Sequence, residues 1–314
     1  MERSITGKIK VVPGDKGGRF PFCNTLYIDD EIKVIVDPGA GPDILLEIKN
    51  RSGVDLVLNT HCHFDHIAYN YIFNDAKIYL NENEGICFQN REEIPRRIGM
   101  IEVYGEDYTR EWLERISKKD SPQSPYSPQN RHEWWLSTAR LDGTFRWGEV
   151  FDLGKTKMEI IGSPGHSAGF SCLYFPDWGV VYTGDIDLTG FGPFYGCTDS
   201  DIDLFIDSAR KVARLDADIF ITGHEVGVVT RREFLSLLEK YLEIIGEREQ
   251  KILAALAVPL SLKEITGQGL IYGSPKFLVD QWVWVWEEMM VKHHLKRMLD
   301  RGVISFDEGK YVRV

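Results

Sequence analysis

The 314-residue sequence lacks any apolar run near the length of about 18 residues that a membrane-spanning helix requires. Its first residues, MERSITGKIKVV, contain no apolar segment that ends at a small-residue cleavage site, so we expect neither a membrane span nor secretion. Cysteine is scarce: the five cysteines are scattered, odd in number and without a CxxC pair. This excludes a disulfide framework and favours the reduced thiols of a cytoplasmic protein.

Basic residues are also in the minority, with 37 Lys and Arg against 48 Asp and Glu, a net charge of -11. That balance argues against nucleic acid or another extended polyanion as the partner. The charge is uneven, because residues 1–230 hold 24 basic and 36 acidic residues, whereas residues 231–314 hold 13 and 12. We therefore expect two units, divided near residue 230.

Strand-like apolar runs dominate residues 1–80 and 151–225, whereas the segment between them differs. Within residues 85–150, the stretch 90–119 has helical patterning, and three prolines follow in 120–129. We interpret residues 85–150 as an insertion. It forms either a lid over a site or an ordinary helical cover of the core.

The most informative segment is His61-Cys62-His63-Phe64-Asp65-His66, which places four candidate metal ligands within six residues. Because side chains alternate in extended chain, positions 61 and 63 project to one side and Cys62 to the other. Neutral imidazole and carboxylate suit zinc, and also iron or manganese. We expect a metal site here, with Cys62 as a buried structural thiol.

Three later segments repeat one form, in which an apolar strand runs into a turn with a glycine and then a polar residue. These residues are His166 after Gly165, Asp185 after Gly184 and His224 after Gly223. Glycine allows the tight turn that follows a strand. The pattern predicts that all three side chains join the His61–His66 segment at one edge of a sheet.

In this order, the segments HCHFDH, SPGHSAG, TGDID and TGHE resemble the metallo-β-lactamase superfamily, over roughly residues 5–230. The resemblance implies an α+β fold, an αββα four-layer sandwich with a helical insertion. It also implies two divalent metal ions, with zinc expected and iron or manganese open. By that resemblance the first metal would be held by His61, His63 and His166, the second by Asp65, His66 and His224, and Asp185 would bridge them.

The resemblance further implies hydrolysis by a hydroxide that bridges the two metals. Asp65 and Asp185 are therefore catalytic candidates, and Asp65 could instead be only a base if one metal site were empty. Tyr195 either donates a hydrogen bond to a developing oxyanion or only packs in its loop. Asp187 either supports a ligand histidine or is solvated.

We expect a small-molecule substrate, namely a small ester, lactone or thioester. The alternatives are a phosphodiesterase or nuclease, a mononuclear-iron enzyme similar to persulfide dioxygenases, and a metal-binding regulator with a DNA-binding tail. A nuclease needs a basic groove beside His61 and His166. An esterase needs an apolar pocket, lined by Phe191, Phe194 or tryptophans between 134 and 147.

Residues 231–314 resemble a winged-helix module, with helices near 248–253, 260–265 and 291–299 and a wing at 303–314. The third of these helices has a local excess of Lys and Arg, which suits nucleic acid, although the near-neutral tail counts against it. Three tryptophans alternate with valine at 282–286. They serve tail packing or a homodimer through this region, a pocket wall, or nucleic-acid contact.

Overall fold

Two mixed β-sheets form the centre of the structure, a computed structural model that describes residues 2–90, 92–117 and 140–314. The first sheet has the order β1-β2-β3-β4-β5-β6-β7, with antiparallel pairs up to β4 and parallel pairs from β4 onward. Its strands are β1 (Arg3–Ser4), β2 (Ile9–Val12), β3 (Thr25–Ile28), β4 (Val34–Val36), β5 (Leu56–Leu58), β6 (Lys77–Asn81) and β7 (Gly143–Phe145).

The second sheet has the order β13-β12-β11-β10-β9-β8, in which only β11 and β12 pair in parallel. Its strands are β8 (Val150–Asp152), β9 (Lys157–Gly162), β10 (Ser171–Phe175), β11 (Val180–Gly184), β12 (Ile219–Thr222) and β13 (Val228–Thr230).

The strands carry apolar residues on both sides, so one face of each sheet packs against the other sheet and the opposite face can be covered by helices. Leu26 and Ile28 of β3 pack against Leu173 and Tyr182 of the second sheet, and all four are fully buried. Tyr27, between the first two, belongs to a different cluster on the outer face of the first sheet. Both faces of each sheet are therefore covered.

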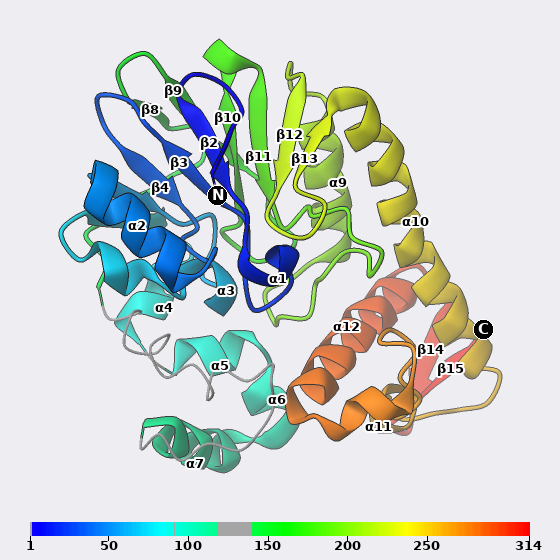
Figure 1. The fold of residues 1–314 in the computed structure, drawn as a ribbon. Coiled ribbons are helices and arrows are strands. Elements are labelled where there is room, and N and C mark those ends of the chain that lie inside the picture. Colours follow the sequence, from blue (N-terminus) through cyan, green and yellow to red (C-terminus); the bar gives the residue numbers. More distant parts are fainter. Residues whose placement is uncertain (1, 91, 118–139) are drawn as a thin grey trace.

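Helices complete the outer layers, as Figure 1 shows. On the outer face of the first sheet lie α2 (Pro42–Ser52) and α3 (Phe64–Ile67), and on that of the second lie α9 (Ile202–Ala213) and the first half of α10 (Arg231–Ala255). The predicted αββα sandwich is thus confirmed. Short helices near the strand ends are α1 (Asp15–Gly18), η1 (Asn70–Phe73) and η3 (Pro176–Trp178).

The predicted insertion is helical over residues 86–117, apart from residue 91, which lies outside the described residues. Its helices are α4 (Ile86–Gln89), α5 (Glu93–Arg97), α6 (Met100–Tyr104) and α7 (Glu106–Ser117). The predicted end at residue 150 is wrong, because β7 and the start of β8 already belong to the two sheets. Part of the predicted lid, including the proline-rich stretch and Trp134 and Trp135, lies outside the described residues.

After α10, the chain continues through α11 (Leu262–Thr266), η4 (Pro275–Val279) and α12 (Gln281–Asp300) to a hairpin of β14 (Ile304–Asp307) and β15 (Lys310–Arg313). The three helices predicted for this region fall within α10, α11 and α12, but η4 lies between the second and the third, and the winged-helix resemblance stays a prediction. The alternating tryptophans, however, lie in the first turns of α12, not outside the third helix. Asp280 caps this helix by accepting hydrogen bonds from the backbone N–H groups of Trp282 and Val283.

The C-terminal region shares a core with the sandwich. Trp282, Val285 and Met289 of α12 lie in the same buried cluster as the outer face of the first sheet. Met289 also lies beside Gly99, where an added Cβ would approach its side chain within 2.6 Å. The division expected near residue 230 therefore falls at the start of a helix that belongs to both parts.

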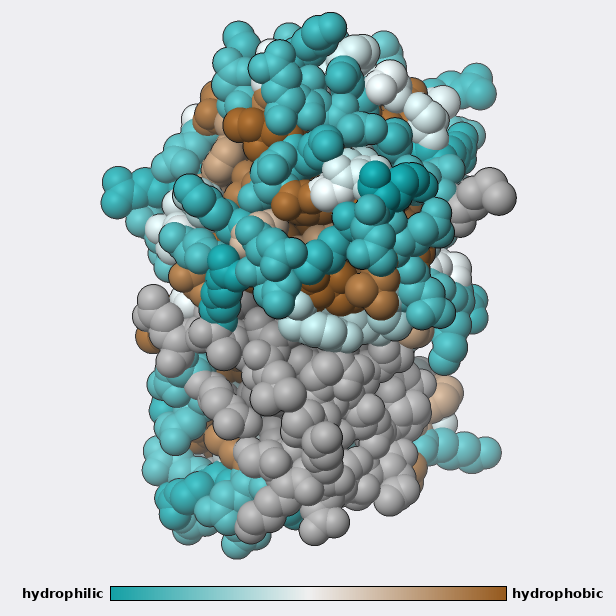
Figure 2. All heavy atoms as spheres, turned by 60° about the vertical axis from the view of Figure 1, so that its left-hand side comes forward, coloured by the Kyte–Doolittle hydropathy of each residue, from teal (hydrophilic) through white to brown (hydrophobic). Residues whose placement is uncertain are grey.

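Hydrophilic residues cover much of the coloured part of the face in Figure 2, with apolar residues between them in patches. Among the described residues, none of the helices combines the length and the apolar character needed to cross a bilayer.

Candidate metal centre

Four strand ends deliver the predicted ligands to one place. His61 follows β5, His166 follows β9, Asp185 follows β11 and His224 follows β12. At His166 the turn needs Gly165, which has a φ of +123° and whose Cα lies so close to the backbone of Phe205 that a Cβ would clash at 2.1 Å. The prediction that these segments meet at one edge of the sandwich is therefore confirmed.

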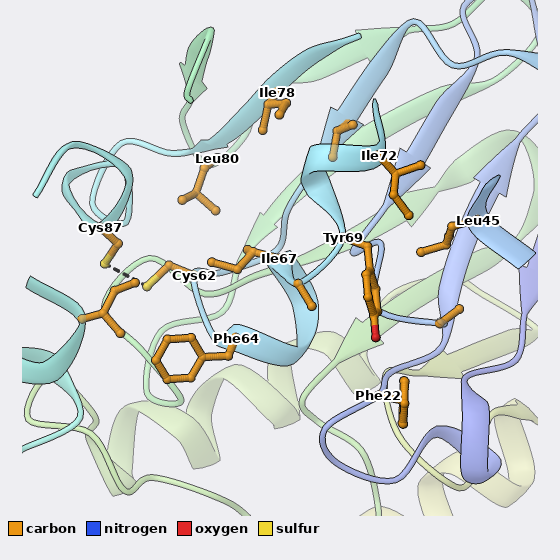
Figure 3. Close-up of a cluster of buried hydrophobic side chains, with 14 of the residues drawn as sticks. Phe22, Leu45, Cys62, Phe64, Ile67, Tyr69, Ile72, Ile78, Leu80 and Cys87 are labelled. Atoms are coloured by element: carbon orange, nitrogen blue, oxygen red, sulfur yellow. Dashed lines mark hydrogen bonds between the residues drawn. The ribbon is translucent and has the colours of Figure 1, made fainter. Parts of the chain in front are cut away.

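The residues between the ligands of the first motif anchor it in the core. Cys62, Phe64 and Ile67 belong to the hydrophobic cluster shown in Figure 3. The Sγ of Cys62 lies 3.0 Å from the Sγ of Cys87, which is on α4. Cys62 is buried and faces the core, as the alternation predicted.

His61, His63, His166 and Asp185 form the first ligand group. Nε2 of His166 lies 2.8 Å from Nδ1 of His63, 3.2 Å from Nε2 of His61 and 3.2 Å from Oδ2 of Asp185. His61, His166 and Asp185 are buried, and His63 is partly exposed.

Asp65, His66 and His224 form the second group. Nε2 of His224 lies 3.3 Å from Nε2 of His66 and 3.1 Å from Oδ2 of Asp65. The other carboxylate oxygen of Asp185, Oδ1, lies 2.9 Å from Nε2 of His66 and 3.5 Å from Nε2 of His224. Asp185 therefore presents one oxygen to each group.

These separations fit metal ligands. In a tetrahedral zinc site with ligand bonds of about 2.05 Å, adjacent ligand atoms lie about 3.3 Å apart. The observed distances between donor atoms lie close to that value in both groups. Oδ1 of Asp185 is also buried without a well-directed hydrogen bond. The chemistry and spacing of the donors thus suit divalent metal ions.

The pKa values divide the histidines into two sets. Burial and neighbouring histidines lower the pKa of His61 well below its usual value, and burial lowers that of His63 to about 3. Burial also lowers the pKa of His66 and His224, but the neighbouring acidic groups, with Asp185 the strongest and Asp65 next to both rings, together outweigh it and raise both pKa values well above the usual value. Neutral imidazole is the form that binds metal.

Asp37 supports the second group, and sequence reasoning missed this role. Its Oδ2 lies 2.8 Å from Nδ1 of His66, and its two oxygens accept hydrogen bonds from the backbone N–H and the hydroxyl of Thr60 at 2.7 Å each. Asp37 is fully buried at the end of β4. Its place directly after a buried strand, beside β5, is the signal that could have identified it.

A cavity of about 260 Å³ opens onto the ligand groups. Around it stand Phe20, His63, Phe64, Asp65, Ile98, Asp185, Asp187, Thr189, Phe191, Phe194, Cys197, His224, Glu225, Tyr272 and Trp286. The sandwich, the insertion and the C-terminal region all contribute, through Phe191, Ile98 and Trp286 respectively. Most of the walls away from the ligands are aromatic or aliphatic.

Comparison with known proteins agrees with this geometry. The family model described as Metallo-beta-lactamase superfamily matches residues 18–79 and 93–224. The chain belongs to the metallo-β-lactamase superfamily. The ligand cluster at the strand ends is accordingly a site for divalent metal ions.

Curated relatives within the superfamily match only part of the chain. An acyl-coenzyme A thioesterase, MBLAC2 of Bos taurus, is 24% identical over 174 residues, which are 51% of this chain and 56% of that protein. The hydroxyacylglutathione hydrolase of Brucella ovis is 34% identical over 87 residues, 27% of this chain and 33% of that protein. The chain thus spans about half the length, or less, of these curated relatives.

Solved structures share the fold over nearly the whole chain. The metallo-beta-lactamase family protein TTHA1429 of Thermus thermophilus matches with a TM-score of 0.72 and 17% identity, covering 99% of this chain and 100% of that one. A beta-lactamase domain protein from Burkholderia ambifaria matches with a TM-score of 0.69 and 17% identity, covering 100% and 94%. The fold similarity therefore includes the C-terminal region.

The candidate catalytic role of Tyr195 and the candidate pocket role of Trp147 must be corrected. Tyr195, for which an oxyanion donor and loop packing were both open, is fully buried and does not line the cavity. Its hydroxyl accepts a hydrogen bond from Arg248 and lies 2.9 Å from Nε2 of His294, so it packs in its loop. Trp147 donates a hydrogen bond from Nε1 to the hydroxyl of Ser171, is 40% exposed and does not line the cavity.

Phe191 and Phe194 both line the cavity, as the esterase hypothesis requires. Asp187 lines it as well, and burial raises the pKa of its carboxyl. Tyr272 and Trp286 also line the cavity, although they belong to the C-terminal region and lie far from the ligands in the sequence. Of the roles open for the alternating tryptophans, the pocket wall applies to Trp286.

Proposed function

We propose that the protein is a metal-dependent hydrolase that acts on a small ester, lactone or thioester with an apolar group next to the scissile bond. The observation that carries this proposal is that all seven donor residues converge at one end of an apolar, aromatic cavity. A hydrolase needs a metal site open to substrate, and residues of both ligand groups line the cavity. The relatives named as thioesterase and hydroxyacylglutathione hydrolase support the same reaction class.

Two ions are proposed, most simply zinc, since imidazole and carboxylate donors at these spacings suit it. His61, His63 and His166 would hold the first, Asp65, His66 and His224 the second, and Asp185 would contribute to both. Bound there, the two ions would supply Lewis acidity, which lowers the pKa of water and polarises a carbonyl oxygen. The second donor group is complete, so a second ion has its ligands, and the metal content separates this arrangement from the mononuclear-iron alternative.

The chain's own residues would bind and orient the substrate. Phe191, Phe194 and Trp286 offer an apolar surface for its acyl or alcohol part and exclude water beside the ligands. The ring of Trp286 contacts that of Phe194 edge-on at 6.0 Å and that of Phe20 at 5.8 Å. Packing of this kind holds the wall in one conformation before the substrate arrives.

The cavity disfavours the nuclease alternative. Among the described residues that line it, none is Lys or Arg, whereas four carboxylates line it. Beyond the metals, a phosphodiester backbone would meet no positive side chain on the described part of that wall.

The basic residues of α12 are also engaged within the chain. Lys296 pairs with Asp300, while Arg297 and Arg301 pair with Asp203. This weakens the case for nucleic acid at α12 and for a DNA-binding regulator. The homodimer and the cytoplasmic location stay predictions.

The test is a substrate panel with the full chain loaded with zinc. The panel holds p-nitrophenyl esters of rising chain length, aromatic lactones, acyl thioesters and bis-p-nitrophenyl phosphate. We expect kcat/KM to be highest for an apolar ester, lactone or thioester, and hydrolysis to stop when the metal is removed and to return when it is restored. A preference for the phosphodiester would contradict the proposal.

A further inference from the structure

The segment 191–197 contacts the ring nitrogens of His63 and His166 that face away from the other ligands. Phe194 accepts a hydrogen bond on its carbonyl oxygen from Nδ1 of His166, at 2.9 Å. The Sγ of Cys197 lies 3.3 Å from Nε2 of His63. Since His63 turns Nδ1 toward the other ligands, its proton is on Nε2 and is donated to the sulfur. The segment 191–197 thereby orients both imidazoles.

The segment itself is irregular chain that belongs to neither a strand nor a helix. Its position is set by the C-terminal region. Arg248 of α10 is 2% exposed and donates hydrogen bonds to the carbonyl oxygens of Phe191 and Pro193, each at 2.6 Å, and to the hydroxyl of Tyr195 at 2.8 Å. A buried guanidinium is tolerated only where its donors are satisfied, and here the segment satisfies them.

Helix α12 holds the other end of the segment. Nε2 of His293 lies 2.6 Å from the carbonyl oxygen of Cys197, and Nε2 of His294 lies 2.9 Å from the hydroxyl of Tyr195. Alternate residues of the segment thus bind the C-terminal helices, and Phe194 lies between them with its carbonyl oxygen toward a ligand. At Cys197 both contacts meet, because its carbonyl binds α12 and its sulfur binds His63.

We infer that the C-terminal helices position the first ligand group, with Arg248, His293 and Cys197 as positioning residues that act through the segment 191–197. This inference rests on the ligand assignment made under the proposed function. Partners that hold the non-ligating nitrogen of a metal-binding histidine typically contribute a factor of about 10 to 100 in metal affinity. The role of the C-terminal region is then structural support of the metal site as well as a pocket wall.

The first test compares Cys197→Ala, which removes the acceptor, with Cys197→Ser, which keeps one. Zn²⁺ affinity is measured on the metal-free full chain by competition with a chromophoric chelator, and the midpoint of thermal unfolding without metal reports the fold. We expect Cys197→Ala to weaken binding of one of two Zn²⁺ ions by about 10-fold. Cys197→Ser should recover most of this loss. Equal affinities in Cys197→Ala and the unaltered chain would overturn the inference.

The second test addresses the C-terminal helices. His293→Leu removes the donor to Cys197, and Arg248→Met removes the donors to Phe191 and Pro193. Lys296→Ala, an exposed change on α12, is the matched control. We expect the first two variants to lose about 10-fold in affinity for one ion and the control to match the unaltered chain.

If Arg248→Met fails to fold, His293→Leu decides the question, since His293 is only partly buried and its loss leaves Arg248 in place. Unchanged affinity in His293→Leu would show that α12 does not position the site. An unaltered chain that binds no zinc would contradict the proposed function itself, whereas two bound ions with unaffected variants would contradict only this inference.

Discussion

At the scale of single residues, the ligands could be predicted because their signals are local. The motif from His61 to His66 is dense enough to be read without a structure, and His166, Asp185 and His224 each follow a strand and a glycine. Asp37 was missed because its partner His66 is 29 residues away, and a carboxylate after a strand is common. The two roles of Tyr195 could not be separated, because the sequence of an irregular loop does not show which side faces the cavity.

Asp185 is the residue on which the two-metal arrangement depends most. The change Asp185→Asn should lower kcat/KM by more than about 100-fold and reduce the bound metal below two ions, because it removes charge from an atom pair that faces both groups. Activity and metal content are measured on the same sample. Asp216→Asn, an exposed change, is the control. Full activity with both ions retained would show that Asp185 does not bridge.

Tyr195 allows the corrected assignment to be tested. Tyr195→Phe should lower the free energy of unfolding by about 1–2 kcal/mol, since its hydroxyl joins the buried Arg248 and His294. The loss in kcat should stay far below the factor of about 10²–10³ that follows removal of an oxyanion donor. Denaturant unfolding and steady-state kinetics measure the two effects. A loss in kcat of that size without loss of stability would restore the catalytic role.

At the scale of elements, α12 shows what periodicity alone leaves undecided. Trp282, Trp284 and Trp286 alternate with valine, a spacing typical of a strand, yet they form the first turns of a helix capped by Asp280. In a helix Trp282 and Trp286, four residues apart, share one side, and their ring centroids lie 5.9 Å apart. Trp282 enters the core and Trp286 reaches the cavity, whereas Trp284 faces another side and bonds to Glu288. The strands of the sandwich were predictable because both of their faces are buried, so each appears in the sequence as a short, nearly continuous apolar run.

Two of these tryptophans make a matched pair of variants. Trp286→Ala should raise KM for apolar esters by roughly 10-fold with a smaller effect on kcat, because about 1.5 kcal/mol of apolar contact with the substrate is lost. Trp284→Ala, two residues away and outside the cavity wall, should leave KM near its original value. Initial rates over a range of ester concentrations measure both. Equal effects of the two changes would mean that Trp286 acts only through packing of the helix.

At the scale of the whole molecule, the C-terminal region and the sandwich form one structure. The buried cluster that contains Trp282 and Met289 also contains Tyr27 and Ile35 of the first sheet. The charge difference between residues 1–230 and 231–314 led us to expect two units, because composition records charge but not contacts across the chain. The similarity to the two solved structures likewise covers 99% and 100% of this chain, the C-terminal region included.

This continuity predicts a single unfolding transition that shifts with metal. Zn²⁺ at 100 times its dissociation constant should stabilise the native chain by about 2.7 kcal/mol per site, and so raise the midpoint by about 5 °C or more. Calorimetry with zinc and with a chelator measures the shift. Two separate transitions, of which only one responds to zinc, would show that the C-terminal region folds independently of the metal site.

A two-metal centre in this cavity has a direct readout, the metal content per chain. The full chain, purified without added metal, is analysed by inductively coupled plasma mass spectrometry with protein quantified by amino-acid analysis. We expect close to two divalent ions per chain, with zinc the main metal, and fewer than two in Asp185→Asn. A single iron per chain, or no bound metal after zinc is supplied and excess removed, would contradict the two-metal centre.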